Sequence, residues 1–377
     1  MGPDAPLSAR LPDFPWDRLI AATEVAGRHP DGIVDLSMGT PVDPTPPLVQ
    51  EAASAATDAP GYPTVWGIPA LRRSIVDYLV RRCGAVGLDE DGVLPTIGSK
   101  EMVSSLPAQL GLGPGDTVLV PSLAYPTYAV GARLAGADVL VSDATSAAGP
   151  AHIGLVWVNS PANPTGRILP AAHLRKVVEW ARERGAVVAS DECYLEFGWD
   201  GEPVSVLDPA VNGGTLDGVV CLHSLSKRST MAGHRAAFLA GDPRIVSELR
   251  AVRRHAGLMV STPAQHAMRA ALDDDEHVAL QRGRYLARRT ALWTALELAG
   301  FRIDESAGSL YLWATRDEPC MDTVHGLAEL GILVAPGDFY GPSGNRHIRV
   351  ALTATDERVA SAVARLAPSL TPSTDPG

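Results

Sequence analysis

Lysine is scarce in this sequence, and the scarcity singles out one side chain for covalent chemistry. The chain has three lysines among its 32 basic residues: Lys100, Lys176 and Lys227. Lys176 falls on the polar face of an expected helix, as a solvated charge would. Lys227 follows the apolar run 218–223, so we expect it at the carboxyl edge of a parallel sheet, where such sheets bind ligands. Desolvation and nearby cations there lower the pKa of an amine, which can then react with an aldehyde. Taken alone, the segment also fits a solvated loop lysine.

Two other strand ends carry groups that suit a pyridine cofactor. Asp191 and Tyr194 come at the end of an apolar run, and a carboxylate facing a heteroaromatic nitrogen keeps that nitrogen protonated. Asn163 lies in a proline-rich turn after another apolar run, and a rigid turn can aim its amide inward. Each segment alone fits an ordinary loop. Together with Lys227, on three neighbouring strand ends, they form the set that a pyridoxal phosphate site needs.

The phosphate of such a cofactor needs a cradle, and the start of an expected helix offers one. Gly98, Ser99 and Lys100 open that helix, where free backbone N–H groups and a hydroxyl favour an anion. Arg235 follows the reactive lysine by eight residues and can add a bidentate clamp on the same phosphate. Tyr125 can cover the ring, although core packing also explains this tyrosine and the one three residues later.

The elements that position these residues alternate between short apolar runs and helical stretches. This alternation is typical of βαβ units and predicts an α/β fold with a mainly parallel sheet. Between two of these runs Leu174, Val177, Val178 and Ala181 recur at helical spacing, which predicts a crossover helix. The expected strands cover residues 117–121, 138–141, 155–159, 186–190, 218–223 and 236–240.

The last part of the chain changes character. Residues 264–299 form a long charged helical stretch, and its acidic run 273–276 predicts either a solvated face or a helix junction. A hairpin, a helix and further strands follow, and Thr355 before two acidic residues is a sound helix start. These features predict a smaller α+β domain, completed by the N-terminal segment. The tail 371–377 is expected to fray.

Composition limits the possible partners. The net charge is −11, which disfavours nucleic acid and anionic membranes as partners. The four cysteines form no CxxC pair, and the histidines form no HExxH motif, so we expect no metal site and no disulfide framework. The N-terminus has no secretory h-region, and no apolar run reaches the about 18 residues of a membrane span. A cytoplasmic protein is the simplest interpretation.

The longer motifs GSKE, AYPTY, NPTG, SDECY, SLSK and GHR, in this order and spacing, resemble the class I/II aminotransferases of the type I pyridoxal phosphate fold. The resemblance runs from about residue 35 to residue 366. It implies a large domain with a mainly parallel seven-stranded sheet flanked by helices, plus a smaller α+β domain. The implied division is an N-terminal arm over 1–38, a large domain over 39–263 and a small domain with a long linking helix over 264–377.

The resemblance also implies a role for each matching residue. Lys227 would bind the cofactor covalently, Asp191 would contact the pyridine nitrogen, and Asn163 and Tyr194 the 3′-oxygen. Tyr125 would stack on the ring. Arg349 would grip the substrate α-carboxylate, close to Gly39. The residues implied around the phosphate are Gly98, Ser99, the Lys100 backbone, Ser224, Ser226 and Arg235, with Tyr62 reaching the phosphate of a partner subunit.

One position departs from the family pattern. The family usually has glycine two residues after its phosphate arginine, whereas this chain has Ala237 after Arg235 and Ala236. The change adds a methyl group at a crowded place and removes no functional group. The segment between Lys227 and Arg235 keeps the family length, so we expect the phosphate clamp to be retained.

The longest matching strings resemble actinobacterial N-succinyldiaminopimelate aminotransferases of lysine biosynthesis. The implied reaction passes an amino group between N-succinyl-LL-2,6-diaminopimelate and 2-oxoglutarate in a homodimer. Other aminotransferases, C–S β-lyases, cyclopropane-forming synthases and the sensing half of a pyridoxal-binding transcription regulator share the fold and remain alternatives. Two segments are candidates for the distal wall, the part of the pocket that meets the end of the substrate away from its α-carboxylate. They are the loop 337–341 and the basic segment Arg253, Arg254 and His255, although a solvated helix end also explains the basic segment.

Overall fold

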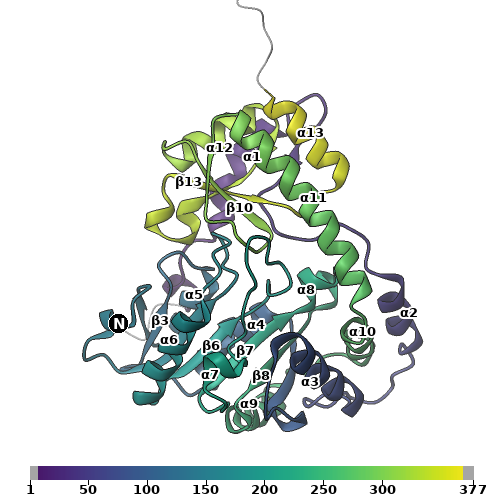
Figure 1. Ribbon diagram of the computed structural model, residues 1–377, viewed down its shortest axis with the longest axis vertical. Helices are drawn as coiled ribbons and strands as arrows, with labels where there is room; N and C mark the ends of the chain where they lie inside the picture. Colours follow the sequence, from purple (N-terminus) through teal and green to yellow (C-terminus); the bar gives the residue numbers. More distant parts are fainter. Residues whose placement is uncertain (1–6, 368–377) are drawn as a thin grey trace, which may run out of the picture.

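The computed structural model describes residues 7–367, so the tail expected to fray, 371–377, lies outside the described residues. Figure 1 shows a large sheet with helices on both faces and, above it, a smaller group of helices and strands around β10 and β13. The long helix α11 (Glu276–Leu298) runs from the region beside the large sheet up into the smaller group. This arrangement matches the α/β fold class expected from the sequence.

The large sheet has seven strands in the order β2-β8-β7-β6-β5-β3-β4. Strand β8 runs antiparallel to both of its neighbours, and the four pairings between β7 and β4 are parallel, as expected. Strand β2 was not predicted, because Pro95 lowers the strand tendency of its sequence. The strands are β2 (Val93–Ile97), β3 (Thr117–Val120), β4 (Asp138–Val141), β5 (Ile153–Asn159), β6 (Val187–Asp191), β7 (Val219–Ser224) and β8 (Ala236–Gly241).

Side chains of each central strand alternate between the two faces, and each face has its own layer of helices. On β5, Val156 and Val158 belong to the core under α6, whereas Leu155 and Trp157 belong to the core under α4 and α5. One face is covered by α2 (Pro47–Ala55), α3 (Pro69–Cys83), α6 (Ala171–Glu183), α7 (Pro209–Asn212) and α10 (Thr262–Leu272). The other is covered by α4 (Ser99–Gln109), α5 (Thr127–Ala135) and α9 (Pro243–Ala256).

The crossover helix and the C-terminal helix form as the sequence patterns predict. In α6 the buried residues are the four expected from the helical spacing: Leu174, Val177, Val178 and Ala181. Helix α13 (Asp356–Leu366) begins after Thr355, whose side chain accepts a hydrogen bond from the backbone N–H of Arg358. Local spacing and capping therefore located both helices.

The smaller group is built on a four-stranded antiparallel sheet in the order β12-β13-β10-β9. The N-terminal segment joins it through a parallel pairing of β1 with β11 and through packing of α1 on α12. The remaining elements are α1 (Ile20–Ala26), β1 (Val34–Asp35), β9 (Arg302–Asp304), β10 (Tyr311–Thr315), α12 (Cys320–Glu329), β11 (Ile332–Leu333), β12 (Ala335–Pro336) and β13 (His347–Ala351).

The acidic run 273–276 is a helix junction, one of the two expected alternatives. Helix α10 ends at Leu272 and α11 begins at Glu276. Helix α10 packs on α2 and α3 within the core of the large sheet. This packing favours moving the domain boundary expected at residue 263 to the start of α11, and the division itself stays a prediction.

Candidate active site

Lys227 lies on α8 (Leu225–Arg228), a single short turn directly after β7. Ser224, the last residue of β7, caps this turn by accepting a hydrogen bond from the N–H of Ser226 at 3.2 Å. The lysine amine is buried and donates to the carbonyl of Gly39. Burial lowers the pKa of Lys227, and the Arg349 and Arg235 cations add to this effect while nearby Tyr311 opposes it. Such an amine is suited to nucleophilic attack.

Asp191 is the last residue of β6, the strand next to β7. Its Oδ2 accepts a hydrogen bond from the hydroxyl of Tyr128 at 2.8 Å, and its Oδ1 accepts one from the N–H of Cys193 at 3.2 Å. Burial raises the pKa of the Asp191 carboxyl, and these hydrogen bonds counteract the rise. Because a buried carboxylate is costly without a cation, this site favours a positively charged partner such as a protonated pyridine nitrogen.

Tyr128 has a role that the sequence did not reveal. Core packing was one expectation for it, and its ring does stack on Trp157 with centroids 4.7 Å apart. Its hydroxyl nevertheless reaches the carboxylate of Asp191. The available signal was its spacing: Tyr128 follows Tyr125 by three residues at the start of α5, so both lie at the same edge of the sheet.

Three of the expected phosphate residues, Gly98, Ser99 and Lys100, lie at the start of α4, whereas Ser224 and Ser226 lie at the end of β7 and on α8. Gly98 has a φ of +76°, and a Cβ atom there would overlap the guanidinium of Arg235, so glycine is required on both counts. Ser99 opens the helix with its free N–H groups. The side chain of Lys100 is exposed and lies 5.8 Å from the ring of Phe14, so only its backbone is available for a phosphate.

Ala237, the departure from the family pattern, fits within the sheet. It lies on β8 between Ser224 of β7 and Thr96 of β2, and it is completely buried. The extra methyl group therefore occupies an ordinary strand position beside the cradle. The segment from Lys227 to Arg235 ends two residues before Ala237, so the methyl group does not interrupt it.

Arg349 lies on β13 of the smaller sheet and is almost completely buried. One terminal nitrogen donates to Oδ1 of Asn163 at 2.8 Å, and the other donates to the carbonyl of Ser37 at 2.6 Å. Its guanidinium carbon lies 4.0 Å from the centre of the Tyr311 ring and 4.9 Å from that of Tyr340. Arg349 thus joins the smaller domain to the turn that follows β5.

Tyr311 connects the two halves of the site. Its hydroxyl lies 2.8 Å from the hydroxyl of Tyr194, and a Cβ atom on Gly39 would overlap the same hydroxyl. Tyr311 was assigned no role from the sequence, and the pairing of β10 with β13 explains its position. Trp313 pairs with Arg349 across β10 and β13, so Tyr311 lies two residues along on the same face as Arg349.

Two polar atoms beside Arg349 have no hydrogen-bond partner among the described residues. They are the Nε of Arg349 itself and the hydroxyl of Tyr340, both buried. Tyr340 ends the short helix η6 (Gly337–Tyr340), within the loop expected to line the distal wall. Buried donors normally have acceptors, so both atoms fit a site that receives a polar ligand such as a carboxylate.

Tyr62 and Arg253 lie outside this cluster of site residues. Tyr62 is 96% exposed and does not reach the site within one chain. Arg253 was a candidate for the distal wall or for a solvated helix end, and its complete burial fits neither prediction. Its guanidinium is completely buried and forms two hydrogen bonds, of 2.8 and 2.9 Å, to the carboxylate of Glu101 on α4. Arg254 and His255 remain exposed in the last turn of α9.

One buried group of potential metal ligands lies next to the site: Cys83, Glu192 and His223. The carboxylate of Glu192 is already bonded, because it accepts from the N–H of Val206 at 2.8 Å and lies 3.0 Å from Nε2 of His223. These contacts satisfy the buried charge through hydrogen bonds. We therefore assign this group a structural role.

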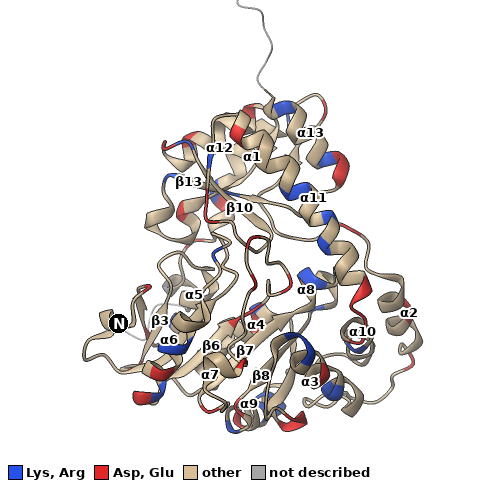
Figure 2. Cartoon of the chain, viewed as in Figure 1, with Lys and Arg blue, Asp and Glu red and all other residues tan. Residues whose placement is uncertain are grey.

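The residues present fit pyridoxal phosphate. The site brings together a buried amine with a lowered pKa, a buried carboxylate and a glycine cradle under Arg235. In Figure 2 the short helix α8, which carries Lys227, is a basic segment at the upper edge of the large sheet.

No helix among residues 7–367 is long and apolar enough to cross a membrane.

Comparisons with known proteins agree with this geometry. The family model "Aminotransferase class I and II" matches residues 31–366. A probable aminotransferase of Mycobacterium tuberculosis is 62% identical over 96% of this chain and 86% of its own length. The 4-dedimethylamino-4-oxo-anhydrotetracycline transaminase of Streptomyces rimosus is 55% identical, over 94% of this chain and 99% of its own.

More distant relatives and solved structures extend the likeness. An LL-diaminopimelate aminotransferase of Dehalococcoides mccartyi is 31% identical over 96% of this chain and 98% of its own. The substrate-bound structure of BacF from Bacillus subtilis superposes with a TM-score of 0.86 and 27% identity, covering 97% of both chains. The chain therefore belongs to the class I and II aminotransferase family, whose members use pyridoxal phosphate on the type I fold.

Proposed function

We propose that the protein transfers an amino group from N-succinyl-LL-2,6-diaminopimelate to 2-oxoglutarate, with the catalytic roles assigned to its residues below. The observation that carries the proposal is the position of the Lys227 amine on the Gly39 carbonyl. Gly39 in turn packs against Tyr311, which lies under the guanidinium of Arg349. A substrate whose α-carboxylate binds Arg349 would present its amino group and Cα close to Lys227.

Each residue then has a defined task. When bound, the cofactor withdraws electrons from the substrate Cα through its protonated ring. Lys227 holds the cofactor before substrate arrives and afterwards carries the proton to and from the substrate Cα. Asp191 keeps the proton on the ring nitrogen, and Tyr128 orients the carboxylate. Tyr194 and Asn163 hold the 3′-oxygen, while burial of the site keeps water away from the proton transfers.

The phosphate of the cofactor is assigned to the cradle at the start of α4. Gly98, Ser99 and the backbone of Lys100 would bind its oxygens through N–H groups, and Arg235 would clamp it. Ser224 and Ser226 would add polar contacts from the turn that carries Lys227. Tyr125 would cover the ring, because it lies edge-on against Tyr128, with ring centroids 5.9 Å apart, and Tyr128 bonds to Asp191.

The choice of substrate rests on the resemblance of the longest sequence motifs. The relatives named LL-diaminopimelate aminotransferase favour a diaminopimelate skeleton but carry no succinyl group in their name, so free diaminopimelate is the direct competitor. Both proposed substrates carry an α-carboxylate for Arg349, but their distal ends differ in length and in the succinyl amide. One pocket must therefore accept two sizes. The loop of η6 can line it, since Tyr340 contributes an unpaired buried hydroxyl and Arg18 forms an ion pair with Asp338 at 2.9 Å. Exposed Arg254 is a candidate for supplying positive charge, with His255 beside it.

A second candidate is amino transfer to a polycyclic ketone. The relative from Streptomyces rimosus is named for an anhydrotetracycline ketone and is 55% identical over almost its whole length. Such a substrate has no α-amino acid carboxylate, so it would engage the aromatic groups Tyr125, Tyr311 and Tyr340 more than Arg349. The two candidates therefore differ in their dependence on Arg349.

The deciding experiment follows the transfer of the amino group in single half-reactions. The cofactor-loaded protein is mixed with succinylated, acetylated or free diaminopimelate, with glutamate, aspartate, alanine or aromatic amino acids, and its absorbance change gives kcat/KM for each. We expect the succinylated compound to have the highest kcat/KM. A pocket that hydrogen-bonds the succinyl group would keep unpaired polar atoms when the free diamine binds. A preference for a control amino acid would overturn the substrate, and pyruvate with ammonia formed from cystathionine would favour a β-lyase.

We also propose a cytoplasmic homodimer whose sites share residues. The four cysteines are free, which suits a reducing compartment. Tyr62 is assigned to the cofactor phosphate of the partner subunit, and its exposure in one chain supports this role. Mixing a Lys227→Ala variant with a Tyr62→Phe variant tests sharing, because a mixed dimer would regain one intact site. A monomer that stays active at high dilution would contradict the proposal.

A further inference from the structure

Arg228, the residue after Lys227, is an arginine whose hydrogen-bonding capacity is fully used. A guanidinium has five N–H groups, and here each group has an acceptor, although the side chain is only 4% exposed. The acceptors are Oε1 of Glu196 at 3.4 Å, Oγ of Ser229 at 3.1 Å, the carbonyls of Ala271 at 2.6 Å and Asp274 at 3.4 Å, and Oδ1 of Asp275 at 3.1 Å.

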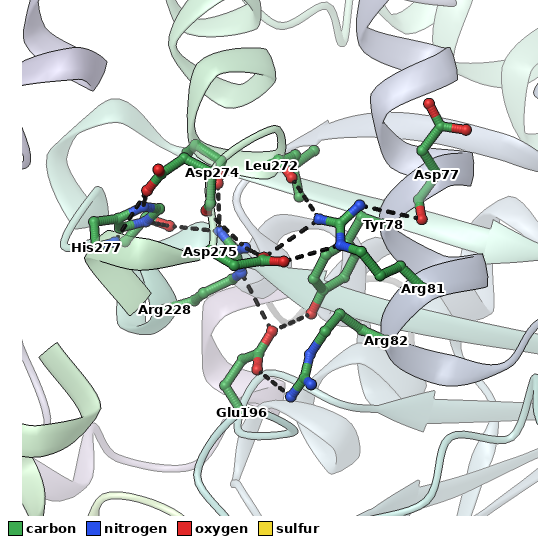
Figure 3. Close-up of polar contacts among 12 residues, drawn as sticks. Asp77, Tyr78, Arg81, Arg82, Glu196, Arg228, Leu272, Asp274, Asp275 and His277 are labelled. Carbon is green, nitrogen blue, oxygen red and sulfur yellow. Dashed lines mark hydrogen bonds and ion pairs between the residues drawn. The ribbon is translucent and has the colours of Figure 1, made fainter. Parts of the chain in front are cut away.

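These acceptors come from separate parts of the fold. Glu196 lies in the segment after β6, five residues beyond Asp191, whereas three of the other acceptors lie at the end of α10 and in the junction before α11. Figure 3 shows Arg228 between the two groups, with Glu196 on one side and the junction residues on the other. One side chain thus ties the lysine-bearing turn α8 to a strand end of the sheet and to the helix junction.

Two of these acceptors are held in place by side chains of α3. Glu196 accepts a hydrogen bond from the hydroxyl of Tyr78 at 3.0 Å and one from Arg82 at 2.7 Å. Asp275 accepts from Nε of Arg81 at 2.9 Å. The cations around Glu196 hold the pKa of its carboxyl below the ordinary value despite its burial. The charge that faces Arg228 therefore persists through the neutral pH range.

A second connection runs from the same turn to the long helix. Nε2 of His277, in the first turn of α11, lies 2.9 Å from Oγ of Ser229, and its Nδ1 lies 2.5 Å from Oδ2 of Asp274. Helix α11 continues into the smaller domain, where Arg288 binds both carboxylate oxygens of Asp43. The junction beside α8 is thus one place where the long helix is anchored beside the large sheet (Figures 1 and 3).

We propose that Arg228 is a positioning residue, which holds the amine of Lys227 in register with the cofactor by fixing α8 against the α10–α11 junction. The proposal rests on the role assigned above to Lys227. Helix α8 has only four residues, so its own hydrogen bonds cannot hold it rigidly. Lysine in place of Arg228 would keep the charge, but with three donors and no planar fork it could not reach all five acceptors.

The test compares Arg228→Lys with Arg182→Lys in the cofactor-loaded enzyme. Arg182 is a matched control, because it also bonds several backbone carbonyls, those of Asn212, Thr215 and Asp217, on a loop that precedes β7. Both variants are expected to lower the melting temperature. Only Arg228→Lys is expected to change the visible circular dichroism of the bound cofactor and to lower kcat about tenfold or more with little change in KM, because the amine is displaced.

An unchanged dichroism spectrum and kcat in Arg228→Lys, with only a lower melting temperature, would overturn the proposal. If that variant does not fold, Asp275→Ala replaces it, since it removes one half-exposed anchor of Arg228. It is expected to shift the same dichroism band by a smaller amount, and no shift would again overturn the proposal. Lys227→Ala separates the two claims: a cofactor absorption band that keeps its wild-type position in that variant would disprove the role of Lys227 itself.

Discussion

The hydroxyl of Tyr128 donates a hydrogen bond to Oδ2 of Asp191 at 2.8 Å, and both side chains are buried. The tyrosine comes from α5 and the carboxylate from the end of β6, so the contact joins the helix layer to the carboxyl edge of the sheet. It stabilises the charged form of a carboxyl whose burial favours the neutral form.

Tyr128→Phe is expected to lower kcat about tenfold, corresponding to about 1.4 kcal/mol for one lost hydrogen bond to a charged group. Without the hydroxyl, the proton shared by Asp191 and the ring nitrogen moves toward the carboxylate, and the ring withdraws electrons less well. Steady-state kinetics measure the change. Tyr285→Phe is the control, because its buried hydroxyl has no partner among the described residues. Equal kcat in both variants would show that the contact is not catalytic.

Asp191→Asn is expected to lower kcat more than Tyr128→Phe does. An amide cannot hold a proton on the ring nitrogen by charge, so kcat should fall by orders of magnitude, well beyond the fall in Tyr128→Phe. Cofactor binding should persist through Arg235 and the phosphate cradle, which absorbance at equilibrium can check. Wild-type kcat in this variant would refute the assignment of Asp191.

The sequence located the candidate site residues whose positions depend on local signals and missed those whose positions depend on distant contacts. Lys227, Asp191 and Gly98 follow strands or open a helix, so spacing and residue type were sufficient. Tyr311 reaches the site only because β10 pairs with β13, which no local pattern specifies. Arg253 resembled a solvated or ligand-binding cation for the same reason, since its partner Glu101 is 152 residues away in the chain.

Removing the amine of Lys227 should change how the stability of the cofactor-free protein depends on pH. The pKa of this lysine lies below its ordinary value of 10.5 in the folded protein, so the unfolded chain binds more protons between the two values. In that window the free energy of unfolding of the wild type increases as pH rises. Below the window, the charged amine at a buried position destabilises the folded protein. Lys227→Met lacks this contribution.

We therefore expect the melting temperature of cofactor-free Lys227→Met, relative to wild type, to be highest at neutral pH and to decline toward pH 10 or so. Thermal unfolding of both proteins at a series of pH values measures the difference. Lys176→Met is the matched control, because Lys176 lies exposed on α6. A difference that stays constant over the whole range would show that the pKa of Lys227 is not lowered.

Arg349→Lys should raise KM much more than it lowers kcat. The lysine keeps a positive charge but loses the planar fork, and a hydrogen bond to a charged group contributes about 1.5–3 kcal/mol, or about 10–100-fold in affinity. KM for both the amino donor and the 2-oxo acid should rise together, because both use the same carboxylate site. Arg346→Lys, on the exposed start of the same segment, is the control. Unchanged KM for both substrates would show that Arg349 does not bind their carboxylates.

Arg253→Met tests the corrected role of the basic segment in α9. The guanidinium is buried on the carboxylate of Glu101, in the first turn of the helix that begins with Ser99. Removing one partner leaves an uncompensated charge, and breaking a buried pair usually costs about 3–5 kcal/mol. We expect lower stability and weaker cofactor binding, because α4 carries the phosphate cradle. The ratio of kcat/KM between succinylated and free diaminopimelate should stay the same. Denaturant unfolding and the half-reaction panel measure both, and Glu101→Gln should reproduce the loss of cofactor affinity. A changed substrate ratio in Arg253→Met would return this arginine to the distal wall.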